Sequence, residues 1–523
     1  MGLNVIDNIL LLFLFAVFSV TCGISILHYI HMFQLCSYKL NSYIKWCRSN
    51  VKSIIRIANI IIIIPLFFAF IGKRYFVISG IIVLFLMLYC NRPRKAKKPL
   101  VYTSRIIRLI VTIELIVIAA VALSAFLNYI LVALILIAIY WILPMIVIMA
   151  NYVDMPIQKA INRWYYCDAV KKLRSHPNLI VIGVTGSYGK TSTKYFLYKL
   201  LSTKYNVLMT PESYNTPLGV VKTIRSSLNA THDIFIVEMG AKNAGDIKEI
   251  CNLVSPNYGV ITSVGPQHLE TFKTIENVIF TKFELADSLP EDGIVFLNFD
   301  NEYIKSNAQK YKYVSYGTNS INNPDFTAKD LQVNNTGSSF TVENKKGETQ
   351  QFACKLLGKH NIENILASIA VSNTLGISIS NLVSAVKKIE AVPHRLQLIK
   401  VKAFTIIDDA YNSNPIGSIA ALDALSGFSE TRILVTPGMV ELGTMQDELN
   451  YKFGQHAAVT CDYVILVKSK QTDKINEGLI NSGFAPEKIF KVDTVQSALM
   501  KVGDIAKSGN SVALLENDLP DNY

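Results

Sequence analysis

The stretch from Val181 to Thr193 reads VIGVTGSYGKTST and combines the residue types that bind phosphate. Its apolar start predicts a buried strand, and the residues from Lys194 to Leu201 can form a helix. A tight glycine loop between them can point backbone N–H groups at phosphate oxygens, while its lysine reaches the outer phosphates and its threonine hydroxyl holds Mg²⁺. The loop is shorter than the common G-x-x-x-x-G-K-[ST] pattern. We therefore expect a nucleoside triphosphate site with these binding residues: Gly186, Ser187, Gly189, Lys190, Thr191 and Ser192.

Further polar residues follow the strands expected next along the chain. Glu238 comes directly after the apolar run Ile234–Val237, where a Mg²⁺ beside a phosphate loop needs an oxygen ligand. His268 lies just beyond the run Tyr258–Thr262 and could be another metal ligand, although a lone histidine is more often structural. Lys282 taken by itself could equally be an ordinary helix lysine.

The part of the chain before the phosphate loop is of a different kind, because it is dominated by long apolar runs. Crossing a membrane requires about 20 apolar residues, with a range of roughly 17–25. All the runs but the short third one meet this requirement, and a cleaved signal peptide cannot account for so many. Residues 1–154 are therefore predicted to form a multi-pass helical membrane domain with these spans: Ile9–Tyr29, Ile54–Ile71, Tyr75–Cys90, Leu109–Leu127 and Tyr129–Ala150.

Basic residues indicate how this domain is oriented. They are concentrated in two connections, at residues 39–56 and 92–108, and the alternate connections are nearly bare. The positive-inside rule then puts the N-terminus outside the plasma membrane and the catalytic domains in the cytoplasm. Much of the net charge of +12 lies in these connections, so anionic membrane lipids are the expected partners. The sequence does not show the alternation of aromatic and basic residues that would indicate a nucleic-acid-binding groove. The 8 cysteines lack the paired spacing of a disulfide framework.

Beyond the last apolar run, short β-branched runs alternate with helical stretches. This alternation predicts α/β layers with largely parallel sheets. Residues 155–177 are expected to form a basic juxtamembrane helix or linker, in which Trp164, Tyr165 and Tyr166 would suit the lipid headgroup layer. A central domain is expected at 178–392 and a C-terminal domain at 393–523.

From Asn178 onward the chain resembles the Mur ligase family. The resemblance implies that family's central P-loop ATPase domain and Rossmann-like C-terminal domain, following the α-helical membrane domain. It rests on motifs that occur in the family's order: TGSYGKTS, then SYNTPLG (Ser213–Gly219), EMGA (Glu238–Ala241), GPQHLE (Gly265–Glu270), TKFE (Thr281–Glu284), NFDN (Asn298–Asn301), GKHNIEN (Gly358–Asn364), PHRLQ (Pro393–Gln397) and DDAYNSNP (Asp408–Pro415).

The resemblance also implies residue roles. Lys190 and Thr191 would bind the ATP phosphates and one Mg²⁺, with Thr191, Glu238 and His268 as the metal ligands. Lys282 matches the lysine that the family carbamylates with CO₂, which gives an anion able to support a second Mg²⁺. Lys190, His268, Lys282 and Arg395 are the implied catalytic residues. The remaining assignments are Asn361, Asn364 and Asp409 for the nucleotide, and Tyr214, Asn215, Thr216, Tyr411, Asn412 and Asn414 for the other substrates.

The implied activity is ATP-dependent amide formation. An acceptor carboxylate attacks the γ-phosphate of ATP to give an acyl phosphate and ADP, and an amine then displaces phosphate. The expected substrates are an amino acid or dipeptide amine and a cell-envelope glycan or glycopeptide carboxylate of peptidoglycan-type biosynthesis. The acceptor is expected to be membrane-associated, and lipid-linked in one version, because the membrane domain stands where the family carries its UDP-sugar-binding domain.

Two further departures from the family concern the C-terminal domain. Gly438-Met439-Val440 precedes Glu441-Leu442-Gly443 where the D-alanyl-D-alanine-adding member has Gly-Asp-Met, and the chain ends with an acidic segment where that member has a lysine-glycine-serine turn. Three alternatives remain open. They are the D-alanyl-D-alanine-adding ligase with its soluble substrate, a polyglutamate ligase, and a nucleotide-binding membrane scaffold without catalysis.

Overall fold

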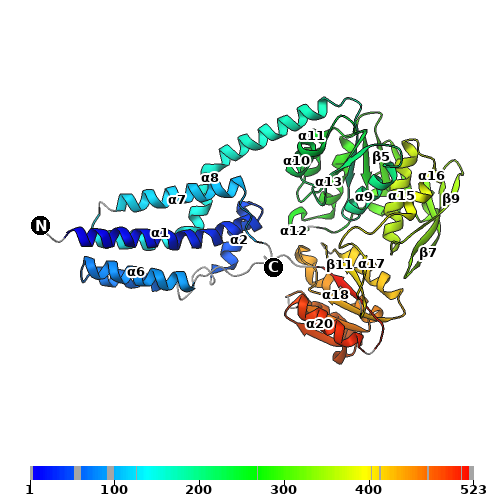
Figure 1. Ribbon diagram of the computed structural model, residues 1–523. Helices are drawn as coiled ribbons and strands as arrows, with labels where there is room; N and C mark the ends of the chain where they lie inside the picture. The colour runs from blue at the N-terminus through cyan, green and yellow to red at the C-terminus, as the bar shows by residue number, and fades with distance from the viewer. Residues whose placement is uncertain are drawn as a thin grey trace. The chain divides into compact units, whose positions relative to one another are not determined.

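The computed structural model describes residues 4–51, 61–90, 99–124, 127–267, 269–401, 403–411, 414–467, 470–507 and 509–517. The chain divides into two compact units, with the division between Trp164 and Tyr165. We call the part before it the helical unit and residues 165–519 the α/β unit. Figure 1 labels their helices and strands along the chain.

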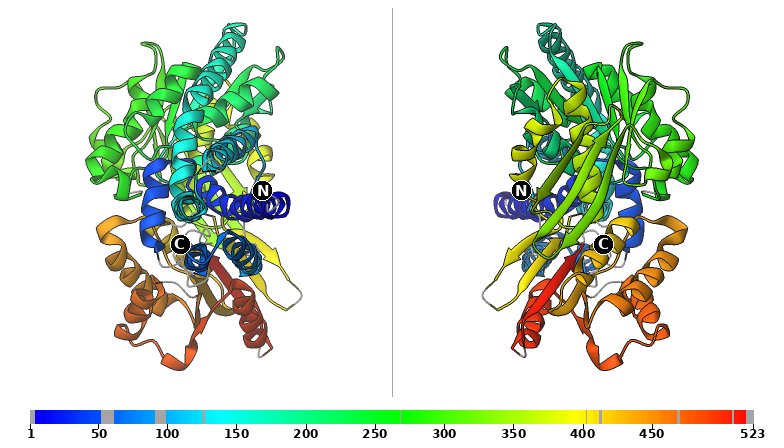
Figure 2. Two further views of the ribbon diagram at one scale, coloured as in Figure 1. Left: turned by 90° about the vertical axis from the view of Figure 1, so that its left-hand side faces the viewer. Right: turned by 90° about the vertical axis from the view of Figure 1, so that its right-hand side faces the viewer.

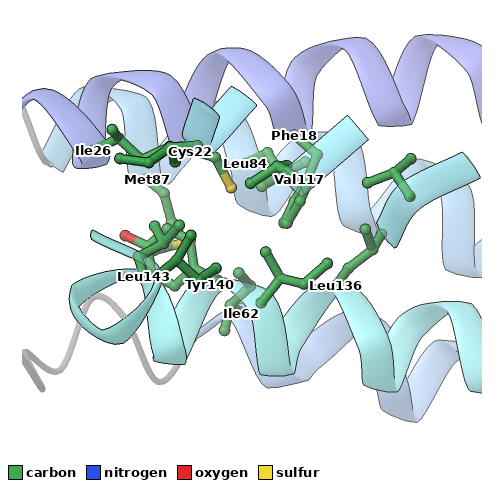
Figure 3. Packing of buried hydrophobic residues seen from close by; sticks show 14 of the residues in the cluster. Phe18, Cys22, Ile26, Ile62, Leu84, Met87, Val117, Leu136, Tyr140 and Leu143 are labelled. Atoms are coloured by element: carbon green, nitrogen blue, oxygen red, sulfur yellow. The ribbon is translucent and has the colours of Figure 1, made fainter. Parts of the chain in front are cut away.

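The helical unit is a bundle whose long helices pack through apolar side chains. Phe18 and Cys22 of α1 are buried together with Leu84 of α6, Val117 of α7 and Leu136 of α8 (Figure 3). These helices form because long, uninterrupted apolar segments satisfy their own backbone hydrogen bonds only as helices. Their bounds are α1 Asn4–Leu35, α2 Leu40–Ser49, α5 Ile64–Ala69, α6 Lys73–Cys90, α7 Ser104–Ser124 and α8 Tyr129–Arg174, with a 3₁₀ turn at Ile61–Ile63.

Among the described residues, 3 helices are long and apolar enough to cross a membrane: Ile9–Leu35, Ser104–Leu123 and Ile130–Arg174. They carry the first, fourth and fifth predicted spans, although Ala125 and Phe126 near the end of the fourth are outside the description. The third predicted span lies on α6, which is 18 residues long and begins with Lys73 and Arg74. The second lies partly outside the described residues.

The predicted juxtamembrane helix is the last part of α8, a single helix of 46 residues that contains Pro144 and Pro156. Its end packs within the α/β unit, where Ala169 is fully buried. Arg225 holds it there, with Nε 2.6 Å from the Asp168 carboxylate and the guanidinium 4.1 Å above the Tyr165 ring.

The central sheet of the α/β unit has 9 strands in the order β2-β3-β1-β4-β5-β6-β7-β8-β9. It is parallel from β2 to β7 and antiparallel from β7 to β9. Buried side chains of α9, α15 and α16 cover one face of the sheet, and those of α10, α11 and α13 cover the other. Figure 2 shows the same ribbon from two further sides. The strands are β1 Ile180–Thr185, β2 Val207–Met209, β3 Ile234–Glu238, β4 Tyr258–Ile261, β5 Ile294–Asn298, β6 Tyr313–Gly317, β7 Phe326–Asn334, β8 Gly337–Asn344 and β9 Thr349–Cys354. The helices are α9 Lys190–Leu201, α10 Pro217–Ser227, α11 Asp246–Val254, α12 Leu269–Phe272, α13 Ile275–Asp287, α14 Glu302–Ser306, α15 Lys359–Thr374 and α16 Ile379–Lys387.

A second sheet has 6 strands in the order β10-β11-β15-β12-β13-β14, and only β10 runs antiparallel to its neighbour. Helices α17, α18 and α19 pack on one face and α20 on the other. The predicted α/β class with largely parallel sheets is confirmed. The bounds are β10 Gln397–Lys400, β11 Thr405–Asp409, β12 Thr431–Thr436, β13 Tyr463–Val467, β14 Ile489–Val492, β15 Ser511–Glu516, α17 Pro415–Ser426, α18 Gln446–Thr460, α19 Thr472–Asn481 and α20 Val495–Ala506.

Candidate functional site

The phosphate loop has the predicted strand–loop–helix form, with β1 ending at Thr185 and α9 beginning at Lys190. Gly186 and Gly189 have φ angles of 152° and 79°, which residues with a side chain rarely adopt. A Cβ on Gly186 would lie 2.1 Å from Thr262 Oγ1, and one on Gly189 would lie 2.5 Å from Asn364 Oδ1. Glycine at both positions avoids these clashes and lets the loop make the turn into α9, whose first backbone N–H groups can bind an anion.

Lys190 is turned back onto its own loop. Its Nζ donates to the carbonyl oxygens of Gly186 at 2.7 Å and Ser187 at 3.3 Å. Burial lowers the pKa of Lys190 to about 8; the charge of Glu238 opposes this shift and that of Arg395 adds to it. The ammonium is therefore a poorly hydrated cation, and phosphate oxygens would offer it stronger partners than neutral carbonyls.

Glu238 ends β3 inside the protein, with 1% of its surface exposed. Its Oε1 accepts hydrogen bonds from Thr191 Oγ1 and Asn215 Nδ2, both at 3.1 Å. Its Oε2 lies 3.0 Å from Lys194 Nζ in an ion pair but accepts no hydrogen bond from any described residue. A buried carboxylate oxygen lacking an aligned donor, next to a threonine hydroxyl, fits the oxygen ligands that Mg²⁺ prefers.

The described ranges contain no group of three or more His, Cys, Asp or Glu side chains placed to hold a metal ion. The predicted ligand His268 lies outside the described residues. Thr191 and Glu238 are therefore the predicted metal ligands that the structure brings together.

Lys282 on α13 is almost completely buried, with 1% of its surface exposed. Burial is the main cause that lowers its pKa well below the ordinary lysine value, and the nearby charge of Lys190 adds to the effect while Glu284 and Asp246 oppose it. Its Nζ lies 6.0 Å from the centre of the Phe272 ring. A lysine in this environment carries a neutral amine much more readily than an exposed one, and a neutral amine is nucleophilic.

Arg395 lies between two residues with positive φ angles. The residues on either side, His394 and Leu396, have φ angles of 61° and 44°, a region that costs about 1–3 kcal/mol per residue. Two carboxylates of β11 fix this turn: His394 Nδ1 lies 2.7 Å from Asp408 Oδ2, and the Leu396 N–H donates to Asp409 Oδ1 at 3.2 Å. Burial, followed by the charge of Glu516, raises the pKa of Asp409 to about 7.

One cavity of about 350 Å³ brings many of these residues together. Its walls come from both sheets of the α/β unit. The predicted residues that line it are Gly189, Ser192, Asn361, Asn364, Arg395, Asp409, Tyr411 and Asn414. Asn361 and Asn364 lie one helical turn apart on α15, and Asn364 Oδ1 accepts from Thr193 Oγ1 at 3.1 Å. Lys190, bonded to its loop, is not among the lining residues.

The predicted substrate residues have partners of their own. Tyr214 OH accepts from Lys222 Nζ at 3.0 Å, and Thr216 Oγ1 caps α10 at the Gly219 N–H. Asn414 caps α17, accepting from the Gly417 N–H at 2.7 Å. Tyr411 OH and Ser213 Oγ are 2.5 Å apart, and their hydrogen bond links the domain of the second sheet to the domain of the central sheet. Asn412 lies outside the described residues.

Sequence reasoning gave no role to several polar residues of this region. Asn298, Asp300 and Glu363 line the cavity, and Asn298 Nδ2 donates to Glu363 Oε2 at 3.3 Å. Lys194, buried beside Glu238, was expected only as part of a helix. The signal for Lys194 was its place one helical turn after Lys190, which puts both lysines on the same side of α9.

Comparisons with known proteins match both domains of the α/β unit. Residues 184–372 match the Mur ligase middle domain and residues 394–515 match the Mur ligase, glutamate ligase domain. The UDP-N-acetylmuramoyl-tripeptide--D-alanyl-D-alanine ligase of Bacillus subtilis is 30% identical over 338 residues, which cover 64% of this chain and 72% of the relative. The Escherichia coli ligase of the same name is 31% identical over 300 residues, covering 57% of this chain and 66% of the relative.

Solved structures show the same fold. The MurF ligase from Thermotoga maritima in complex with ADP matches with a TM-score of 0.61 and 26% identity, over 68% of this chain and 80% of that one. MurF from Acinetobacter baumannii matches with a TM-score of 0.62 and 23% identity, over 68% and 77%. The chain belongs to the Mur ligase family, whose members are ATP-dependent amide-forming ligases that use Mg²⁺.

Proposed function

We propose that this protein is a membrane-bound ligase that couples ATP cleavage to an amide bond between a cell-envelope carboxylate and the amine of an amino acid or dipeptide. The observation that carries the proposal is the cavity. It combines the phosphate-loop residue Gly189 and the asparagines of α15 with Arg395 and Asp409 from the second sheet. A nucleotide bound to the domain of the central sheet would therefore face Arg395, a cation from the domain of the second sheet.

The chain's own residues would divide the work. Lys190 leaves its loop carbonyls to bind the terminal phosphates, and Arg395 offsets the charge that develops on them. When bound, Mg²⁺ supplies further charge neutralisation at the phosphates, with Thr191 and Glu238 as its protein ligands. Because the cavity walls come from two domains, their approach would also shield the activated acyl group from water.

Lys282 is proposed to carry a carbamate. Its buried amine would attack CO₂ to form the N–C bond and release one proton, which turns a potential cation into an anion. This chemistry requires the neutral amine, and the burial of Lys282 favours that form. In the proposed site the carbamate oxygens of Lys282 would help to hold a second Mg²⁺.

The membrane assignment rests on 3 helices in the described part of the chain that are long and apolar enough to cross a bilayer. We place the protein in the plasma membrane with the α/β unit in the cytoplasm, where ATP is present. An acceptor confined to the same bilayer, such as a lipid-linked glycopeptide, would reach the site at a high effective concentration.

The names of the Bacillus and Escherichia relatives favour a second candidate, in which the soluble UDP-linked muramoyl-tripeptide is the acceptor and D-alanyl-D-alanine the amine. The test offers UDP-muramoyl-tripeptide and a lipid-linked equivalent to the full-length protein in lipid and to a fragment that starts after Asp154. The membrane proposal expects ATP-dependent ligation mainly for the full-length protein with the lipid-linked acceptor. Equal, fast use of the soluble acceptor by both proteins would overturn it in favour of the second candidate.

A further inference from the structure

Lys194 is a buried lysine in the second turn of α9 that the roles described so far do not use. None of its surface is exposed, whereas Lys199 on the same helix faces solvent. Burying an ammonium group is costly unless the group is paired, so the protein must stabilise Lys194 through specific contacts.

These contacts join the predicted metal ligand to a neighbouring loop. Lys194 Nζ lies 3.0 Å from Glu238 Oε2 and also donates to the carbonyl oxygen of Glu212. Glu212 has a φ angle of 43°, and the chain just after it reaches Asn215, whose amide donates to the other oxygen of Glu238. The lysine and the loop therefore approach the carboxylate of Glu238 from both of its oxygens.

Two roles are compatible with a lysine in this place, and they differ in sign. A lysine that competes with Mg²⁺ for the carboxylate would weaken metal binding. A lysine that fixes the carboxylate in its orientation would strengthen metal binding, because outer partners of metal ligands typically do so. The bond from Nζ to the backbone at Glu212 favours the second role, because it prevents the ammonium from following a moving carboxylate.

We propose that Lys194 is a positioning residue that fixes the Glu238 carboxylate for the Mg²⁺ bound with the nucleotide. This inference rests on the metal role proposed for Glu238. It assigns to Lys194 a contribution to metal affinity that does not require contact with nucleotide, acceptor or amine.

The test measures ADP binding by calorimetry at a series of Mg²⁺ concentrations, with the full-length protein in lipid nanodiscs. For each variant we compare the Mg²⁺ concentration at which the association constant for ADP reaches half of its value at saturating Mg²⁺. In Lys194→Met this concentration should rise by about tenfold or more, because that is the usual effect of losing an outer partner of a metal ligand. Lys194→Arg should restore most of the affinity. The matched control Lys199→Met, an exposed lysine of the same helix, should behave as the unchanged protein.

Unchanged or tighter Mg²⁺ dependence in Lys194→Met would overturn the inference, even if the variant melts at a lower temperature. If Lys194→Met does not fold, Lys194→Met combined with Glu238→Gln removes both buried charges, and its Mg²⁺ dependence should equal that of Glu238→Gln alone. A further loss in the double variant would contradict a role through Glu238. Glu238→Gln alone tests the underlying proposal, because normal Mg²⁺ dependence there would remove the metal role of Glu238 itself.

Discussion

The helical unit and the α/β unit bury different kinds of side chain. Among the described residues of the helical unit, the buried polar ones are Thr21, Ser25, Asn151 and Asp154, whereas the cluster that packs its long helices together is apolar (Figure 3). The α/β unit buries Lys194, Glu238 and Lys282 in one region beside the phosphate loop. Buried charges are costly to keep, so their concentration in one unit indicates where the chemistry takes place.

The ion pair that Asp154 forms in the helical unit has a different setting. Arg108 Nε lies 2.7 Å from Asp154 Oδ1, and Arg105 Nη2 donates to Asn151 Oδ1 at 3.1 Å. Both contacts link the start of α7 to the middle of α8. We interpret these two contacts as interactions that stabilise the packing of α7 against α8. The comparison therefore predicts that changes to the buried charges of the α/β unit affect catalysis, and that changes to the Asp154 ion pair of the helical unit affect stability.

The largest effect is expected for Lys190→Ala. Loss of a preorganised cation at the transferring phosphoryl group should lower kcat/KM for ATP-dependent ligation by about 10²–10³. Phosphate release, measured with Mg²⁺ and both co-substrates present, reports this loss, and the exposed Lys199→Ala serves as its control. Full activity in Lys190→Ala would contradict the assignment of the phosphate loop.

Lys282→Ala should be slower by on the order of a hundredfold, because it removes the anion of the proposed carbamate. Acetate or formate should restore part of the rate by supplying a carboxylate in the space that the side chain leaves. The rate is measured with and without these acids, and again after removal of CO₂ from the unchanged protein. Near-normal rates without any rescue would make Lys282 a purely structural lysine.

The affinity for ATP should depend on pH through Lys190, whose pKa is about 8 in the structure described. Below that pH the ammonium is charged and attracts phosphate; above it the free protein must take up a proton to bind, so affinity should fall by up to about tenfold per pH unit. Lys190→Arg keeps its charge throughout this range and should abolish the dependence. Calorimetry from about pH 7 to 9.5 tests this, and a flat profile for the unchanged protein would contradict it.

The smallest effect on the site is expected for Asp154→Ala in the helical unit. It leaves Arg108 without its carboxylate partner and should cost about 1–3 kcal/mol of stability. Thermal unfolding in detergent measures that cost, and ADP affinity should not change. A loss of ADP affinity in a protein that remains folded would contradict the assignment of nucleotide binding to the α/β unit alone.

Local sequence was sufficient for the phosphate loop. A strand, a glycine turn and a helix start follow one another within Val181–Thr193, so no distant residue is needed to predict them. The largely parallel class also followed from alternating segments. The antiparallel extension β7–β9 was not predicted, since its strands are less apolar and β7 contains an irregularity between Lys329 and Gln332.

The helix α8 shows the limit of local rules. The basic and aromatic residues of 155–177 predicted a juxtamembrane helix or linker that follows the last span. The structure continues one helix through Pro144 and Pro156 instead. A proline removes one backbone hydrogen bond, and the bonds of the turns on either side keep the helix continuous.

The amino-acid sequence by itself determined which residues can bind phosphate, which segments can cross a membrane and which strands are buried, because these properties depend on near neighbours. Tertiary structure alone decided that Lys194 faces Glu238, that Lys282 is buried, and that Arg395 lies in one cavity with the asparagines of α15. The physical reason is that hydration and charge environment are set by whatever packs against a side chain. Those neighbours come from strands and helices far away along the chain.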